Sequence, residues 1–190
     1  MIKNIDIVGI GGSQEENSFS LQILKYTLNE VTLLGARTKL IDIKSLNLPI
    51  YDYSGGKLQP QAGLKKIMDD IHKSHGIIFT SPEYHGTVSA SFKNFIDFLE
   101  FLYSYDPPYL TNKPVGCISI AGGDNSGVNT LNTLVNIVHS LRGITVSSNF
   151  AVSNIKNSFN SAGKLIDEAV IRRIKRLSSD IYFVSSKLSL

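Results

Sequence analysis

The sequence predicts an α/β fold in which one parallel sheet carries helices on both of its faces. Short apolar runs alternate with longer segments in which apolar residues recur at helical spacing. Strands that alternate with helices in this way form such sheets. The chain has 190 residues and shows no internal repeat, low-complexity tract or linker, so one domain over 1–190 is expected.

The first half of the chain supplies three of the predicted strands and two of the helices. The apolar run 5–10 stops at glycines, which is typical of a buried parallel strand. The helical pattern that follows it ends at Gly35, a common helix stop. In order, we expect a strand over 5–10, a helix over 18–34, a strand over 38–43, a helix over 61–74 and a strand over 76–80.

The second half continues the same alternation. Pro114 precedes an apolar run, and Gly143 ends the second helical pattern in this half. We expect a helix over 89–103, a strand over 115–121, a helix over 127–141, a strand over 144–152 and a closing helix over 164–184. The predicted sheet therefore has five strands.

Composition excludes several classes of protein. Apolar residues make up 42% of the chain, the net charge is +3, and no apolar run is long enough to cross a bilayer. We therefore expect no membrane association. The basic run 172–176 has no accompanying nucleic-acid motif and is interpreted as a solvated helix face, so no nucleic-acid partner is expected. The lone Cys117 cannot form an intrachain disulfide, which favours the cytoplasm.

Parallel α/β sheets bind ligands beyond the carboxyl ends of their strands, and the first such loop here, 11–20, is suited to a phosphate. Two glycines allow a tight turn, the following helix presents its N-terminus, and three serines add hydroxyl groups. The spacing fits neither Gly-x-Gly-x-x-Gly nor a Walker A loop, which disfavours a dinucleotide fold and a nucleotide triphosphatase. The alternative is that Ser18 only caps the helix.

Two later loops carry the other unusual residues. After the third predicted strand, residues 81–86 combine a proline, a tyrosine, a histidine and a glycine, which suits a rigid ledge of peptide N–H groups along a flat heteroaromatic ring. After the fourth, residues 121–127 contain the adjacent Gly122 and Gly123, which allow the backbone to approach a ring closely. A plain strand-to-helix connection remains the alternative at both places.

Taken together, these loops resemble the NADPH-dependent FMN reductase family, which includes azoreductases and quinone reductases. Residues 82–85 are similar to the family's Pro-Glu-Tyr-Asn/His segment, and residues 92–97 to the Leu-Lys-Asn-x-x-Asp helix that follows it. Residues 47–52 resemble its Leu-Pro-x-Tyr-Asp segment. The phosphate loop departs from the family pattern because Glu15 stands where arginine is usual and Ser20 where asparagine is usual.

The resemblance implies a flavodoxin-like three-layer sandwich that binds FMN. It also implies that NADPH or NADH reduces the flavin and that a small acceptor, such as a quinone, an azo compound or free flavin, then takes the electrons. No catalytic side chain and no metal ion are expected, and His85 is a candidate donor to the reduced flavin. The candidate cofactor-binding residues are Ser13, Ser18, Phe19, Ser20, Pro82, Glu83, Tyr84, His85, Gly86, Gly122 and Gly123.

The helix predicted over 89–103 carries more large apolar residues than one sheet-facing stripe can bury. We expect a homodimer or homotetramer formed through the helices 89–103 and 127–141, as the family resemblance also implies. A lid over residues 105–109 is the alternative.

A second hypothesis for function remains, an electron carrier or FMN-binding module that oxidises no NAD(P)H. Carriers that dock on basic partners favour acidic surfaces, and the pI near 8.9 argues against this hypothesis.

Overall fold

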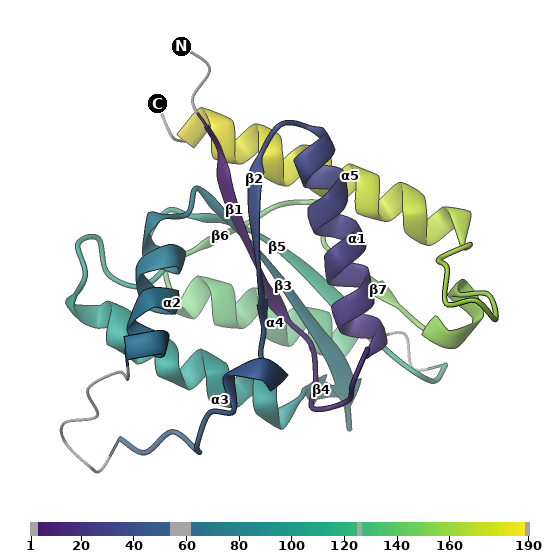
Figure 1. Ribbon diagram of the computed structural model, residues 1–190, viewed down its shortest axis with the longest axis horizontal. Coiled ribbons are helices and arrows are strands. Elements are labelled where there is room, and N and C mark those ends of the chain that lie inside the picture. Colours follow the sequence, from purple (N-terminus) through teal and green to yellow (C-terminus); the bar gives the residue numbers. More distant parts are fainter. Residues whose placement is uncertain (1–3, 54–61, 125–126, 189–190) are drawn as a thin grey trace.

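The computed structural model describes residues 4–53, 62–124 and 127–188 (Figure 1). Its sheet has the strand order β2-β1-β3-β5-β6, and neighbouring strands along this path are parallel. The strands on the path are β1 (Asp6–Gly11), β2 (Arg37–Asp42), β3 (Gly76–Tyr84), β5 (Pro114–Ile120) and β6 (Ile144–Thr145). The predicted parallel α/β architecture is confirmed. The chain adds β2 on one side of β1 and then β3 on the other side, so the strand order reverses at this point.

The sheet contains seven strands where five were predicted. The run 144–152 is divided into β6 and β7 (Phe150–Val152), which both pair with β5. Between them the Asn149 side-chain oxygen accepts the Cys117 N–H at 2.7 Å, so a side chain replaces the backbone acceptor and interrupts the ladder. The other addition is β4 (Thr87–Val88), which pairs antiparallel with the end of β3.

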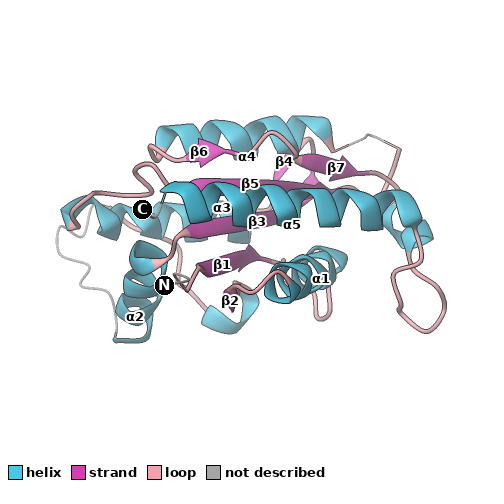
Figure 2. Ribbon diagram, turned by 90° about the horizontal axis from the view of Figure 1, so that it is seen from above, coloured by secondary structure: helices cyan, strands magenta, loops and turns pink. Residues whose placement is uncertain are grey.

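Helices cover both faces of the sheet (Figure 2). One face carries α1 (Phe19–Leu33) and α5 (Glu168–Leu188), which lie side by side (Figure 1). The other face carries α2 (Ala62–Lys73), α3 (Ala90–Phe98) and α4 (Val128–Ser140). The helix predicted over 61–74 matches α2 except at its ends: residue 61 lies outside the described residues, and the helix ends at Lys73, one residue before Ser74.

Two predicted helices differ from the observed ones at their ends. The pattern 89–103 is α-helical only to Phe98, and a 3₁₀ helix, Leu99–Ser104, follows it. The closing helix begins at Glu168, later than predicted, because the Asp167 carboxylate accepts the N–H groups of Ala169 and Val170 and so caps the first turn.

Alternate residues of each central strand supply the two cores. Ile77 and Phe79 belong to the core under α2, α3 and α4, whereas Ile78 belongs to the core under α1 and α5. At Gly9 a Cβ atom would lie 2.7 Å from Leu28 Cδ1, so the glycine permits the close approach of α1. In the described parts of the chain, no helix is both long and apolar enough to span a membrane.

Candidate functional site

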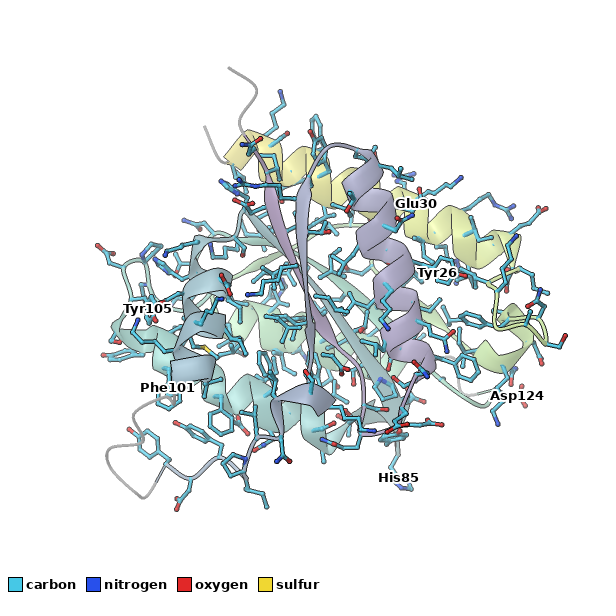
Figure 3. The ribbon with its side chains drawn as sticks, in the orientation of Figure 1. Tyr26, Glu30, His85, Phe101, Tyr105 and Asp124 are labelled. Carbon is cyan, nitrogen blue, oxygen red and sulfur yellow. The ribbon has the colours of Figure 1, made fainter. Side chains whose placement is uncertain are left out.

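The carboxyl ends of β1, β3 and β5 meet at one end of the sheet. The first and third candidate loops follow β1 and β5, whereas the strand predicted over 76–80 continues to Tyr84 and includes the first four residues of the predicted loop 81–86. His85 and Asp124, which belong to the second and third loops, lie at this end in Figure 3. The first loop starts beside the second, because Gly11 pairs in register with Thr80, the residue of β3 just before the second loop. This is the edge at which the sequence placed a ligand.

The first loop carries three serines, Ser13, Ser18 and Ser20, and two of their hydroxyls meet at the start of α1. The Ser18 hydroxyl accepts the Leu21 N–H at 3.3 Å and lies 3.1 Å from the Ser20 hydroxyl. Ser13 accepts the Glu15 N–H at 3.1 Å. All three serines are buried, whereas residues 14–17 are exposed. Ser18 is therefore a helix cap, as the alternative interpretation held, and its hydroxyl also lies beside that of Ser20.

A lysine from another segment reaches the acidic side of this loop. Lys44 begins the 3₁₀ helix Lys44–Leu46 after β2, and its ammonium lies 3.1 Å from the Glu16 carboxylate. The Lys44 N–H is fixed by the Asp42 carboxylate at 3.1 Å. Glu15 is exposed and Glu16 is highly exposed, so the ion pair with Lys44 is weak and easily exchanged.

The second loop is a tight β-hairpin. Glu83 pairs with Val88 and Tyr84 with Thr87, which leaves His85 and Gly86 as the two turn residues. Their φ angles are +53° and +79°, as a type I′ turn requires, and glycine at the second position adopts this conformation readily. The base of the hairpin is fixed by Ser81, whose buried hydroxyl accepts the Ser89 N–H at 3.1 Å.

The hairpin is tied to helix α4 by one side-chain contact. The hydroxyl of Thr130, in the first turn of α4, donates a hydrogen bond of 3.0 Å to the carboxylate of Glu83. Thr130 is fully buried and Glu83 is half-buried. Glu83 is thus held on the side facing α4, while His85 in the turn stays exposed (Figure 3).

The third loop is held by Asn154. The backbone N–H of Asn154 donates to the Gly123 carbonyl at 3.1 Å, and its side-chain amide donates to the Asp124 carboxylate at 2.7 Å. Asn154 has a φ of +48°, in the left-handed region, which asparagine adopts more readily than most residues. Residues 125 and 126 of the predicted loop lie outside the described residues.

The second and third loops enclose a cavity of about 440 Å³ between them. Of the predicted cofactor residues, Glu83, His85, Gly86, Gly122 and Gly123 line it, together with Ala121 and Asp124. Ser13, Ser18 and Ser20, the buried serines of the first loop, do not line this cavity and are called the serine cluster below. Phe19 packs on Phe159 with ring centroids 5.1 Å apart, Pro82 is buried, and Tyr84 is 48% exposed at the end of β3.

The model of the NADPH-dependent FMN reductase family matches residues 5–157, which include all three loops. The chain belongs to this family. The protein is therefore an FMN-dependent NAD(P)H oxidoreductase, as the sequence predicted. Its fold is a flavodoxin-like sandwich, which the sequence also predicted.

Curated relatives of this FMN reductase include an NADPH azoreductase of Bacillus sp. strain OY1-2, with 27% identity over 67% of the chain and 65% of the relative. An NADPH:quinone oxidoreductase of Arabidopsis thaliana shares 26% identity over 91% of the chain and 88% of the relative. Among solved structures, the flavoenzyme NAD(P)H:(acceptor) oxidoreductase FerB of Paracoccus denitrificans matches with a TM-score of 0.75 and 17% identity, covering 96% and 98% of the two chains.

Sequence reasoning missed Thr130 and Asn154. Thr130 lies 47 residues from its partner Glu83, and Asn154 lies 30 residues from Asp124. No spacing pattern links residues so far apart, because the contacts depend on how α4 and the segment after β7 pack. The only local signal is that both carry small polar side chains beside a strand or helix end.

Cys117, His72 and His75 each have contacts or burial that indicate a structural role. Burial raises the pKa of the Cys117 thiol, which disfavours the reactive thiolate. His72 contacts the Tyr105 ring at 4.9 Å between centroids, and His75 Nδ1 accepts the Asp6 N–H at 3.0 Å. Among the described residues, no group of three histidine, cysteine or acidic side chains is placed to hold a metal ion.

Proposed function

We propose that the protein binds FMN across the serine cluster and the cavity, oxidises NADPH or NADH, and reduces a small acceptor such as a quinone, an azo compound or free flavin. The observation that carries this proposal is the cavity that the hairpin turn and the glycine loop line together. The first loop, in which the Ser18 and Ser20 hydroxyls meet, follows the neighbouring strand β1. Bound FMN would supply the hydride-accepting and electron-donating chemistry.

The serine cluster fits the phosphate end of the cofactor. The hydroxyls of Ser18 and Ser20 meet where α1 begins, and Ser13 adds a third hydroxyl from the same loop. A helix N-terminus also presents N–H groups and a positive dipole end to an anion. Lys44 supplies a cation beside the loop, which offsets the loss of the arginine that Glu15 replaces. The donor set therefore suits a phosphate.

The cavity fits the ring end. The turn residues His85 and Gly86 lie outside the hairpin ladder, so their peptide N–H groups are available to the polar edge of a flat ring. Gly122 and Gly123 have nothing within 4 Å of the place a Cβ atom would take, so a ring can approach their backbone closely. His85 is proposed as a further donor, and Tyr84 and Pro82, which lie next to the turn in the chain, are proposed to flank the site.

These residues bind and orient, and none is proposed to transfer a proton. The hairpin and the glycine loop would hold the ring edge of FMN, and the serine cluster would hold the opposite end of the cofactor. An exposed His85 and a half-exposed Tyr84 leave the cavity mouth accessible to a nicotinamide or to an acceptor. Alternate occupation of this mouth by donor and acceptor is consistent with a two-step exchange.

We also propose that the protein is a homodimer or homotetramer formed through 89–103 and 127–141. A groove of about 680 Å³ runs between these two segments, and half-buried Ile137, Leu141 and Tyr51 line it. The expectation that helix 89–103 has more large apolar residues than the chain can bury was wrong, because six of them are buried within the single chain: Phe92, Phe95, Ile96, Phe98, Leu99 and Leu102. The groove therefore carries the proposal. Sedimentation velocity across a concentration series tests the proposal, and a species of monomer mass at every concentration contradicts it. A cytoplasmic location is proposed on the single buried cysteine.

The proposed reaction is tested by steady-state kinetics with the FMN-loaded protein. NADPH and NADH are varied against a quinone, an azo dye and free FMN, with oxygen excluded. Parallel double-reciprocal lines are expected, because donor and acceptor use the site in turn. An FMN-loaded protein that accelerates no transfer from either nucleotide would refute the reductase function.

A further inference from the structure

The N-terminus of helix α4 packs closely against strand β5 of the sheet. Its N-cap is Gly127, whose φ is +69° and whose Cβ, if present, would lie 2.9 Å from the hydroxyl of the fully buried Ser119 on β5. Neither a side chain nor another backbone conformation is tolerated easily at this position. The first turn of α4 therefore has a defined place relative to β5.

The hairpin that faces the cavity is anchored to the first turn of α4 through Thr130 and Glu83. The Thr130 hydroxyl donates to the Glu83 carboxylate at 3.0 Å from a fully buried position. The carboxylate also lies beside the N-terminal turn of α4, where the helix dipole favours negative charge. A hydrogen bond to a charged acceptor is stronger than one between neutral groups. Beyond this anchor the turn at His85 and Gly86 projects to the surface.

The two walls of the cavity thus have separate supports. Thr130 holds the hairpin wall on α4, and Asn154 holds the glycine-loop wall through Gly123 and Asp124. The gap between the walls depends on both supports. A change in the hairpin anchor would alter the distance between the turn and Gly122 without touching the serine cluster.

We propose that Thr130 is a positioning residue that sets the flavin-ring ledge by holding Glu83, and that the held carboxylate lowers the reduction potential of the bound flavin. This inference rests on the proposed function. Glu83 lines the cavity, so its negative charge would oppose the anionic reduced ring. Thr130 itself acts only through Glu83.

Three variants separate position from charge. Thr130→Val keeps the shape of the side chain and removes the donor, whereas Thr130→Ser keeps the hydroxyl and serves as the matched control. Glu83→Gln keeps an oxygen that can accept the Thr130 hydrogen bond and removes the charge. If Thr130→Val fails to fold, Glu83→Ala breaks the same contact from the more exposed partner.

Amide hydrogen exchange of residues 84–88, measured without FMN, is the first readout. Thr130→Val should exchange faster in this segment while Thr130→Ser matches the wild type, because the hairpin has lost its anchor. This measurement needs no cofactor, so it stands even if the wild-type protein fails to bind FMN and the proposed function falls. Unchanged exchange in both Thr130→Val and Glu83→Ala would overturn the positioning role.

FMN affinity and flavin potential complete the test. Thr130→Val should weaken FMN binding about fivefold or more, the effect of losing roughly 1 kcal/mol of anchoring. Glu83→Gln should shift the flavin midpoint potential to more positive values, because the charge beside the ring is removed. An FMN-binding wild type whose affinity is unaffected by Thr130→Val, or whose potential is unaffected by Glu83→Gln, would overturn the corresponding half of the proposal alone.

Discussion

The side chain of Thr80 fills the space that a side chain on Gly11 would need. A Cβ atom on Gly11 would lie 1.9 Å from Thr80 Oγ1 and 2.6 Å from the Thr80 carbonyl oxygen. Thr80 is fully buried and is held in β3 between β1 and β5, so its backbone cannot move aside. This contact brings the first loop directly beside the strand that leads into the hairpin.

Gly11→Ala should therefore destabilise the protein by about 1–3 kcal/mol, the usual effect of overpacking a close-packed interior. Urea unfolding monitored by circular dichroism measures the loss. Gly63→Ala is the matched control, since nothing lies within 4 Å of its Cβ position in α2 and alanine is the better helix former. Equal stabilities for the two variants would show that the Gly11 contact is relaxed in solution.

Lys44 should strengthen FMN binding through the phosphate. We expect Lys44→Ala to weaken FMN binding about fivefold at low salt, as the loss of one partly exposed charge contact would. The loss should shrink as salt is added. Fluorescence titration measures the affinity.

Riboflavin, which lacks the phosphate, is the control ligand, and its affinity should be unchanged by Lys44→Ala. Glu16→Gln should improve FMN binding slightly, because it releases Lys44 from its carboxylate partner. Equal losses for FMN and riboflavin would mean that Lys44 only supports the loop.

Asn154 should matter for the cavity wall in two separable ways. Asn154→Ala loses the hydrogen bond to Asp124 and also strains a left-handed backbone, so it should cost roughly 1 kcal/mol more stability than Asn154→Gly. Both variants should weaken FMN binding because both lose the side-chain contact. Thermal unfolding and FMN titration are compared for the pair, and wild-type affinity in both would remove Asn154 from the site.

Lys113 gives a prediction for stability at alkaline pH. Its ammonium donates to the carbonyls of His72 and Ser74, at 2.7 and 2.6 Å, where α2 ends. Burial lowers the pKa of Lys113 from 10.5 to about 8. Between these two pKa values the unfolded chain keeps a proton that the folded chain has lost, so the unfolding free energy rises with pH across that window.

Lys113→Met lacks this titration and keeps every other ionisable group. The unfolding free energy of the wild type relative to Lys113→Met should be constant below pH 7 and should increase between about pH 8 and pH 10.5. Urea unfolding at closely spaced pH values measures the difference. A difference that stays flat or falls over this window would contradict the lowered pKa.

The features that sequence could predict are the ones fixed by local chemistry. Ser18 and Ser89 mark helix starts because each hydroxyl accepts an N–H three residues ahead, at Leu21 and Phe92. The glycine-rich and proline-containing loops could be placed at one edge because parallel strands align their carboxyl ends.

The features it could not predict depend on residues far apart in the chain. The break between β6 and β7 follows from Asn149 reaching Cys117, 32 residues away. The hairpin anchor depends on Thr130, and the cation beside the phosphate loop comes from Lys44, 28 residues from Glu16. Such contacts leave no periodic signal, because packing alone brings the partners together.

The most direct test of the account is the anaerobic reaction of the FMN-loaded protein with NADPH, followed in a stopped-flow instrument at the visible absorbance band of oxidised flavin. We predict rapid bleaching to reduced flavin, then recovery of the yellow colour when a quinone is added. Protein that stays yellow with NADPH and with NADH, but is bleached by dithionite, would contradict a reductase and would favour an FMN-binding electron carrier.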